Sequence, residues 1–592
     1  MPIPPRKILL LVFIFIAIAY VFLLAAFRWS NGQWQETIDS DGKGYFAYTE
    51  HLFLTNSFGS EPYDRDYHVL TDDGQLNKFT CGTALMQLPF FGMATAWAAI
   101  TGYSLEISSL PFQVMVSVAG LFYLLASLFV LMKILQRLNI STGAIVFILL
   151  GTAFGTPALN YSVLGAALSH IYSFFLFTCF IYLLILLRAE NSLRIWLWLA
   201  LVFSLIVLVR PVNGLVVLLA PAFGGGKFFF KHLFQLIRQP LHLLLVFITF
   251  FAPLFLQMIL WQTQTGNWFE WSYKNEGFYF SDPQINEVLA GARKGAFIYY
   301  PIFIPCLAGL FLWRNTAKIS IAWILVYFII FTWIIASWWC WDYGESFGLR
   351  PFTETTIIFI LLFALVLQSK LRWLRWSVSA LAVLATFLNL IYTYQFHFRI
   401  LPQSGMNWEK LEYIFLKTDR QYVNSFGGAE NLPPYAPNGL TLYDTCTQTF
   451  DFYPDSISHT GGNLFPGGCA FIIDKKLASA PGFFAKIQLD KKITTSDGAK
   501  NAELTVQIIR PDGSINYLIS YFLKRFREEP VNTWQEENYS ISANTPMYEG
   551  DELKFYIFNE QNDSFEVDNF RTQLYYPIGN PPTLKLRRIN MQ

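Results

Sequence analysis

The fold of this chain is decided near its start by the stretch "ILLLVFIFIAIAYVFLLAAF", residues 8–27, which contains no charged side chain. An apolar run of about 17–25 residues can cross a bilayer as a helix. No clean small-residue cleavage site follows, which favours a retained span over a signal peptide. Over the whole chain 54% of residues are hydrophobic and 14% charged, whereas soluble domains carry about 25% charged residues. The sequence therefore predicts an integral membrane protein.

Charge and cysteine usage exclude two functional classes. The formal net charge is +1, so no basic field favours a nucleic-acid partner. The six cysteines form no C-x-x-C pair, which argues against a zinc site of the usual spacing. At 592 residues the chain is longer than a typical domain of about 100–200 residues, so we expect more than one unit.

Further apolar runs follow the first one. The clear ones are 112–135, 168–188, 241–261, 297–313, 319–337, 352–368 and 374–393, and the shorter or interrupted ones are 143–158, 193–209 and 212–224. A run with Pro89 inside it, 84–100, is ambiguous. If it does not cross, one set of basic residues beside the spans all face the cytoplasm, as the positive-inside rule requires. They are Arg6, Lys7, Lys133, Arg137, Arg188, Arg194, Lys227, Lys231, Arg238, Arg314, Lys318, Lys370, Arg372 and Arg375. The sequence thus predicts a multispan α-helical membrane protein of about 11 transmembrane helices plus interfacial helices, with a cytoplasmic N-terminus.

The last part of the chain has a different pattern. From about residue 440, short stretches such as "AELTVQIIR" and "ELKFYIFN" alternate apolar and polar residues between Gly, Pro, Asn and Asp turns. This is typical of antiparallel strands, so we expect an all-β, jelly-roll-like sandwich at 440–592. Residues 394–439 form the predicted linker, with an amphipathic helix at 408–424. Residues 1–393 form the membrane domain.

Two cysteines of the tail, Cys446 and Cys469, lie close together in the sequence. The tail follows the last span and falls on the non-cytoplasmic side of the predicted topology. Such compartments are oxidising, so we expect a Cys446–Cys469 disulfide.

The stretch after the first span, "TIDSDGKGYFAYTEHLF" at 37–53, permits three interpretations. Asp39, Asp41, Gly44 and Glu50 match positions 1, 3, 6 and 12 of a calcium-binding loop, but Lys43 stands where an oxygen ligand is needed. A plain turn with Asp41 capping a helix from Gly44 is the second interpretation. The third is the acidic end of a membrane-embedded active site.

Ionisable residues on the predicted outer face favour the third interpretation. Besides the two acids, they are Lys78, His170, Arg210, Arg293, Lys294, Asp342, Glu345 and Arg350. Charges at membrane depth are costly and usually serve a function, although Lys78, Arg293 and Lys294 could instead extend to the interface. Arg binds phosphate bidentately, and a carboxylate accepts a proton or holds a divalent cation. This set suits a reaction at a phosphate headgroup.

The order of these features resembles the C-type (GT-C) glycosyltransferases, which use polyprenyl-phosphate sugars and include protein O-mannosyltransferases and lipid A aminoarabinose transferases. The resemblance covers roughly residues 1–393. It rests on the acid after the first span, the long first outer loop with its Lys, the "RP" turn at 210–211, "G-x-F-x-Y-x-P" at 295–301 and "W-x-x-G-x-S-F-G-x-R" at 341–350. The sandwich resembles carbohydrate-binding jelly rolls.

The resemblance implies roles for individual residues. Asp41, with Asp39 as second choice, is the expected catalytic acid–base residue. Arg210 and Arg350, with Lys78, are expected to bind the donor phosphate. His170, Glu345, Asp342 and Arg293 are the expected further substrate contacts. Asp41 and Glu345 are candidate ligands for a divalent ion such as Mg, Mn or Zn, and no other cofactor is expected.

The implied activity is an inverting transfer of sugar from a polyprenyl-phosphate donor, within the lipid membrane, to a protein, lipid or glycan acceptor at the outer face. A bacterial inner membrane with a periplasmic C-terminal domain fits best. A transporter or lipid-linked-sugar flippase is the main alternative, because such proteins also carry intramembrane charges. A third possibility is a surface adhesion or assembly component, with the sandwich as its working part.

Overall fold

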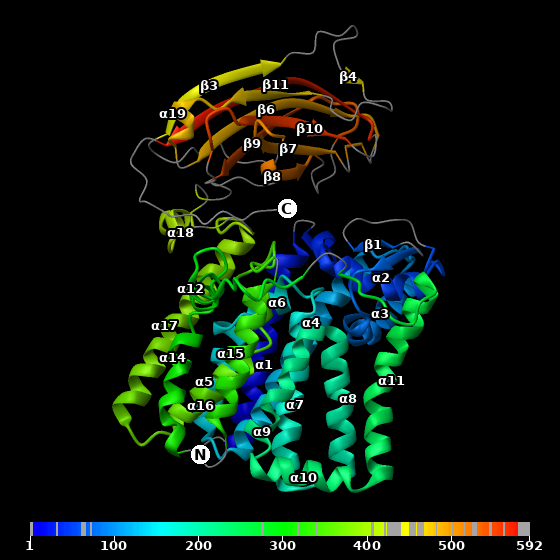
Figure 1. The fold of residues 1–592 in the computed structure, drawn as a ribbon, viewed down its shortest axis with the longest axis vertical. Coiled ribbons are helices and arrows are strands. Elements are labelled where there is room, and N and C mark those ends of the chain that lie inside the picture. The colour runs from blue at the N-terminus through cyan, green and yellow to red at the C-terminus, as the bar shows by residue number, and fades with distance from the viewer. Residues whose placement is uncertain are drawn as a thin grey trace. The chain divides into compact units, whose positions relative to one another are not determined.

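The computed structural model describes most of the chain. The described residues are 4–577 apart from 31–32, 61–66, 72–73, 274–276, 316–318, 339, 404–405, 407, 420–421, 423–439, 449–456, 459–466, 481, 496–497, 500–501, 514, 524–529, 544–546 and 560–562. The chain separates into two compact units, Met1–Tyr394 and Gln395–Gln592. The first is helical and the second is built mainly of strands (Figure 1).

Six helices of the first unit are long and apolar enough to cross a membrane, or up to seven if one bent pair counts as a single span, among the residues described. The six include α1 (Pro5–Leu24), continued by the π-helical turn η1 (Ala25–Trp29), α3 (Gly82–Thr101), α4 (Leu110–Arg137), α7 (His170–Ala189), α11 (Pro240–Thr265) and α17 (Arg372–His397). Shorter apolar helices lie between them: α5 (Thr142–Gly155), α8 (Leu193–Val209), α15 (Ile321–Ser337) and α16 (Thr356–Gln368). The predicted multispan helical membrane fold is confirmed, but among the described residues six or seven helices are long and apolar enough to cross, rather than the expected 11 or so.

Two of the expected spans are broken rather than continuous. The run at 212–224 forms the 3-10 helix η3 (Pro211–Leu219) and then α9 (Ala220–Phe223), and the run at 297–313 forms α13 (Ala296–Tyr299), α14 (Phe303–Cys306) and η4 (Leu307–Asn315). Proline explains the break in the second run, because it lacks the backbone donor that a continuous helix needs. Pro211 starts η3, and Pro301 separates α13 from α14.

The stretch that follows the first span folds into η2 (Gln33–Glu36) and α2 (Asp41–Phe53). Helix α2 starts at Asp41, and the residue before it makes no side-chain cap. The expected cap by Asp41 on a helix from Gly44 is therefore wrong. The calcium loop is wrong as well, because positions 3 to 12 of that loop, Asp41 to Glu50, form one continuous helix and cannot wrap around an ion.

Both glycines of α2 are needed for close packing. A Cβ on Gly42 would lie 2.6 Å from the Cβ of Ala167, and one on Gly44 would lie 2.4 Å from the Phe79 ring. Real Cβ atoms do not approach their neighbours this closely. The sequence "DGKGY" thus lets α2 lie directly against its neighbours.

Helix α3 is apolar enough to span a membrane. It lies beside α2, at the end of the helical unit opposite α10 (Lys227–Ile237) and the N-terminus (Figure 1). Its first residue, Gly82, packs against the backbone at the end of α8. The non-crossing path that the basic residues favour for 84–100 stays a prediction.

The remaining elements of the first unit are short. They are the helices α6 (Ala158–Val163), α12 (Ile285–Ala290) and η5 (Arg350–Phe352), and a hairpin of the strands β1 (His68–Thr71) and β2 (Gly74–Asn77). In the second unit, α18 (Trp408–Ile414) is shorter than the helix expected over 408–424. Leu416, two residues beyond its end, has a positive φ of 58°, which is incompatible with a continuing helix. Much of the predicted linker lies outside the described residues.

The second unit contains two antiparallel sheets. One has the strand order β5 (Gly467–Ile472), β10 (Glu552–Phe558), β7 (Glu503–Ile509) and β8 (Ile515–Phe522). The other has the order β3 (Leu440–Gln448), β11 (Phe565–Pro577), β6 (Phe483–Ile493) and β9 (Gln535–Ala543), with β4 (Ile457–Ser458) paired to β11. A short helix, α19 (Lys475–Ala478), follows β5.

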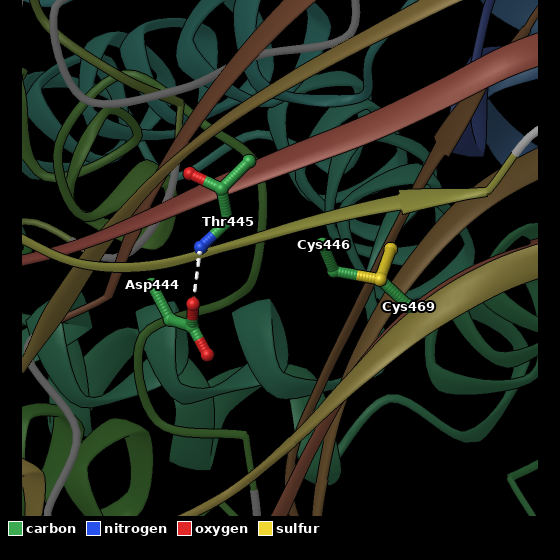
Figure 2. The surroundings of a disulfide bond; sticks show 4 residues. All are labelled: Asp444, Thr445, Cys446 and Cys469. Atoms are coloured by element: carbon green, nitrogen blue, oxygen red, sulfur yellow. Dashed lines mark hydrogen bonds between the residues drawn. A yellow bond between two sulfur atoms is a disulfide. The ribbon is translucent and has the colours of Figure 1, made fainter.

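Alternating side chains from both sheets fill one core. In β6, for example, Ile487 and Leu489 are buried, whereas Lys486 and Gln488 between them are partly exposed. Cys446 of β3 and Cys469 of β5 form a disulfide with a Cα–Cα distance of 6.0 Å (Figure 2). The disulfide links the two sheets, because β3 and β5 belong to different ones.

Candidate functional site

The centre of the candidate site is an ion pair between Asp41 and Arg350. Asp41 is the first residue of α2, and Arg350 begins η5. The Nη1 atom of Arg350 donates to Oδ2 of Asp41 at 2.6 Å. The Asp41 side chain is 24% exposed and the Arg350 side chain is 16% exposed, so solvent and a ligand can reach this pair. Two of the predicted site residues are thus in direct contact.

Arg210 lies in a second, more buried cluster. Its guanidinium contacts Oε1 of Glu354 at 3.9 Å and Nε2 of His170 at 3.1 Å. The Nδ1 atom of His170 is 3.1 Å from the same Glu354 oxygen. The Asn213 amide also donates to this Glu354 oxygen, at 3.4 Å. Glu354 is fully buried, whereas the Arg210 side chain is 15% exposed. Glu354 therefore holds Arg210 from behind.

Tyr45 connects the two clusters. Tyr45 belongs to the same helix as Asp41. Its hydroxyl lies 3.4 Å from Oγ of Ser169, the residue before His170. Burial raises the pKa of the Tyr45 phenol, Asp41 raises it further and Arg210 opposes this. Both charged groups therefore act on one side chain. Arg210 also lies over the Tyr343 ring, at 5.9 Å, in the loop that leads to Arg350.

Several buried polar atoms around these clusters have no hydrogen-bond partner within the described part of the chain. They are Oε2 of Glu354, Oδ1 of Asn213, Nε of Arg350 and Oγ1 of Thr353. Buried polar groups are usually satisfied, and unsatisfied ones often mark a place where a ligand or water binds. The site therefore has spare donors and acceptors for a polar ligand.

The loop that carries Arg350 is held by a third group of contacts. Arg293 pairs with Asp342 at 2.6 Å. The Phe347 carbonyl accepts from the hydroxyls of Tyr161 and Tyr300 at 2.9 and 2.8 Å. The buried Lys294 ammonium donates to the Ser346 carbonyl. Arg293 and Asp342 are expected substrate contacts, and in the structure they pair with each other.

Burial also changes the acidity of Lys294. Loss of solvation lowers the pKa of its ammonium to about 7, although the nearby Asp342 opposes this change. Desolvation disfavours the charged form of an amine. Lys294 is therefore a titratable group beside the loop of Arg350.

The other predicted site residues lie outside the central clusters. The Asp39 side chain is 57% exposed, and its carboxylate lies 3.8 Å from the Lys43 ammonium. The Lys78 ammonium is 5.4 Å from the centre of the Tyr273 ring. Glu345 is an exposed loop residue. The structure thus brings together Asp41, Arg350, Arg210 and His170 from the predicted set.

The predicted metal ligands, Asp41 and Glu345, lie in different surroundings within the described part of the chain. Asp41 already contacts a guanidinium, and no described contact joins it to Glu345. Among the described residues no group of three or more His, Cys, Asp or Glu side chains could hold a metal ion. The metal-ligand role of Asp41 and Glu345 stays a prediction, and no step below depends on it.

Sequence reasoning missed Glu354 and Tyr45. Glu354 stands in "RPFTETTIIF", inside a run expected to cross the membrane. Its position could have identified Glu354 as a site residue, because a carboxylate in an apolar span is a functional candidate by default. Tyr45 gives no such signal, since aromatic residues are common throughout this chain.

Comparisons with known proteins give one structural likeness to report. No family model matches the sequence, and no curated protein matches it. Among solved structures the chain is similar to the arabinosyltransferase EmbB from Mycobacterium smegmatis, determined by cryo-EM, with a TM-score of 0.37 and 11% sequence identity. The match covers 95% of this chain and 64% of the arabinosyltransferase chain, so this chain matches less than two thirds of EmbB. A likeness at this level carries no functional inference.

Proposed function

We propose that this chain is a membrane glycosyltransferase of the GT-C type, which moves a sugar from a polyprenyl-phosphate donor to an acceptor hydroxyl or amine. The observation that carries the proposal is the Asp41–Arg350 pair next to Arg210. A partly exposed carboxylate beside two guanidinium groups, in an otherwise apolar helical unit, suits a reaction at a lipid phosphate. The resemblance of the sequence motifs to GT-C enzymes supports the same class.

Arg210 and Arg350 are proposed to bind the donor phosphate. Arginine pairs bidentately with phosphate oxygens, and such charge-assisted bonds are among the strongest in proteins. Each guanidinium already has a carboxylate partner, Glu354 for Arg210 and Asp41 for Arg350. Glu354 is fully buried and stays in place, whereas the Asp41 pair is reachable by the donor.

Binding of the polyprenyl-phosphate sugar would therefore free the Asp41 carboxylate to act as the base. Once a phosphate oxygen takes the Nη1 donor of Arg350, the Asp41 carboxylate loses its partner and is free to accept a proton. This predicts that the donor binds before the acceptor reacts.

The chemical step needs one base and a stabilised leaving group. The acceptor oxygen or nitrogen attacks the anomeric carbon while its proton moves to Asp41. The bond from the anomeric carbon to the phosphate oxygen breaks, and its electron pair leaves with the polyprenyl phosphate. Two guanidinium groups stabilise the charge that develops on the phosphate. Attack opposite the leaving group inverts the anomeric configuration, and a single carboxylate suffices, unlike the carboxyl pair of glycosidases.

The reaction is proposed to occur at the outer face of a bacterial inner membrane. Asp41 lies at the start of α2, at the end of the helical unit opposite the N-terminus and α10 (Figure 1). With the N-terminus in the cytoplasm, as the basic residues favour, this end of the helical unit is proposed to be the periplasmic one. The sandwich is proposed to bind the glycan part of an acceptor.

The test is turnover by the purified full-length chain in lipid nanodiscs. A panel of polyprenyl-phosphate sugars serves as donor, and envelope glycans and lipids serve as acceptors. Formation of polyprenyl phosphate together with a glycosylated acceptor, detected by mass spectrometry, supports the proposal. In sealed proteoliposomes, movement of an intact lipid-linked sugar between leaflets without cleavage would favour the flippase instead.

A further inference from the structure

Helix α10 differs from the other helices of the first unit in its side-chain pattern. Its sequence with the following residue is "KFFFKHLFQLIR". Residues 227, 231, 235 and 238 fall on one face at a spacing of three or four. That face consists of Lys227, Lys231, Gln235 and Arg238, with Phe234 at its edge beside Lys231 and Arg238. The other side of the helix is formed by Phe229, Phe230, Leu233, Leu236 and Ile237. This is the pattern of an amphipathic helix with a basic polar face.

The chain turns sharply before α10. The apolar segment Pro211–Phe223 and α10 are bent by 110° relative to each other. Three glycines, 224–226, form the turn, and Gly225 and Gly226 have φ values of +86° and +56°. Only glycine adopts these values without strain. Helix α10 consequently runs across the end of the helical unit, near the N-terminus (Figure 1).

Helix α10 makes only a few contacts with the rest of the unit: the Phe229 ring lies beside Trp196, the Phe230 ring lies 6.3 Å from the Trp323 ring, and Gln235 accepts from the Asn191 amide at 2.9 Å. Leu236 is its single buried side chain. The ring of Phe229 lies 6.2 Å from that of Trp196, whereas Phe230, Phe234 and Ile237 are about half exposed. An exposed apolar edge beside an exposed basic face is what a helix in the headgroup region presents to a membrane.

The positive charge of α10 has no local compensation. The sequence contains no Asp or Glu between Glu190 and Glu270. Within the described residues no carboxylate forms an ion pair with Lys227, Lys231 or Arg238, and Arg238 instead lies over the Phe234 ring at 4.2 Å. Charge complementarity therefore requires an anion from outside the protein.

We propose that α10 is a binding site for anionic phospholipid headgroups, in the leaflet at the N-terminal end of the helical unit. The basic face binds the headgroup phosphates, and Phe230, Phe234 and Ile237 insert among the first carbons of the acyl chains. This site is independent of the proposed glycosyl transfer, which lies at the opposite end of the unit.

Native mass spectrometry of the full-length protein, titrated with phosphatidylglycerol or with phosphatidylcholine, tests this proposal. The wild type should retain phosphatidylglycerol preferentially. One basic residue near an anionic surface contributes about fivefold to binding, so K227Q/K231Q/R238Q should reduce the preference at least tenfold. An unchanged preference in this variant would overturn the proposal.

Two matched variants separate the site from net charge and from folding. K475Q/K476Q/R571Q removes the same charge from exposed positions of the sandwich and should keep the wild-type preference. K227R/K231R/R238K keeps the charge of α10 and should do the same. An equal loss in either variant would contradict a specific site on α10.

Discussion

Arg350 donates to Asp41 at 2.6 Å although 309 residues separate them in the sequence. The contact joins the acid after the first span to the arginine that ends "W-x-x-G-x-S-F-G-x-R". Two motifs singled out separately in the sequence thus meet at one point, and the first prediction concerns this pair.

Asp41→Asn should reduce turnover about 100-fold or more, because the amide cannot accept the acceptor's proton and general-base catalysis contributes at least that much. The measurement is product formation by purified protein with matched circular dichroism. Asp39→Asn is the comparison, since Asp39 is exposed and pairs with Lys43. If Asp39→Asn caused the larger loss, the base role would pass to Asp39.

Arg350→Lys and Arg210→Lys should each weaken donor binding about 10-fold or more, because lysine keeps the charge but cannot form the bidentate contact with phosphate. Isothermal titration with a non-hydrolysable polyprenyl-phosphate sugar analogue measures this. Lys43→Gln, close to Asp41 in sequence, should leave donor affinity as it is. Donor affinity unchanged in both arginine variants would refute the phosphate clamp.

Glu354→Gln should lower both stability and donor affinity. It leaves the Arg210 guanidinium without its counter-charge, and breaking a buried pair costs about 3–5 kcal/mol; since Arg210 is partly exposed, the lower end of that range applies. Thermal unfolding and the KM for donor are the measurements. Glu354→Asp restores the charge and should recover part of both effects, whereas a purely steric role for Glu354 predicts no such recovery.

Stability should depend on the protonation of Lys294. The folded pKa of about 7 lies below the ordinary value of 10.5, so the unfolded state binds the extra proton between these pH values. The free energy of unfolding should therefore rise with pH from about 7 to about 10.5, by at most about 1.4 kcal/mol per pH unit. Thermal unfolding at several pH values, for wild type and Lys294→Met, measures this. A slope as steep in the variant as in the wild type would assign the effect to other groups.

Hydrophobicity alone predicted much of the fold. The apolar runs became helices because lipid-facing segments must satisfy their own backbone groups, and alternating residues became strands of the second unit. The run at 212–224 was expected to be short or interrupted, with Pro211 as a helix breaker before it. The break at 297–313 was not predicted, because mean apolar character hides the local effect of Pro301. The Cys446–Cys469 disulfide is present, since the two strands that carry it lie next to each other in the sandwich.

The candidate site was only partly accessible from sequence. Charged residues in apolar surroundings stand out, which explains why Asp41, Arg210, His170 and Arg350 were singled out. Which charges pair depends on tertiary packing. Arg293 and Asp342 pair with each other, and the counter-charge of Arg210 comes from Glu354, 144 positions further along the sequence. No local pattern encodes such long-range partners.

The close packing that Gly42 and Gly44 permit also fixes the position of Asp41. Since α2 is seated by steric contact with Ala167 and Phe79, the ion pair is not what anchors the acid. Neutralising Arg350 should therefore leave the carboxylate where it is, and any kinetic defect would report lost charge rather than a displaced helix. Conversely, one added methyl group at either glycine would shift the acid without altering a single ionisable residue.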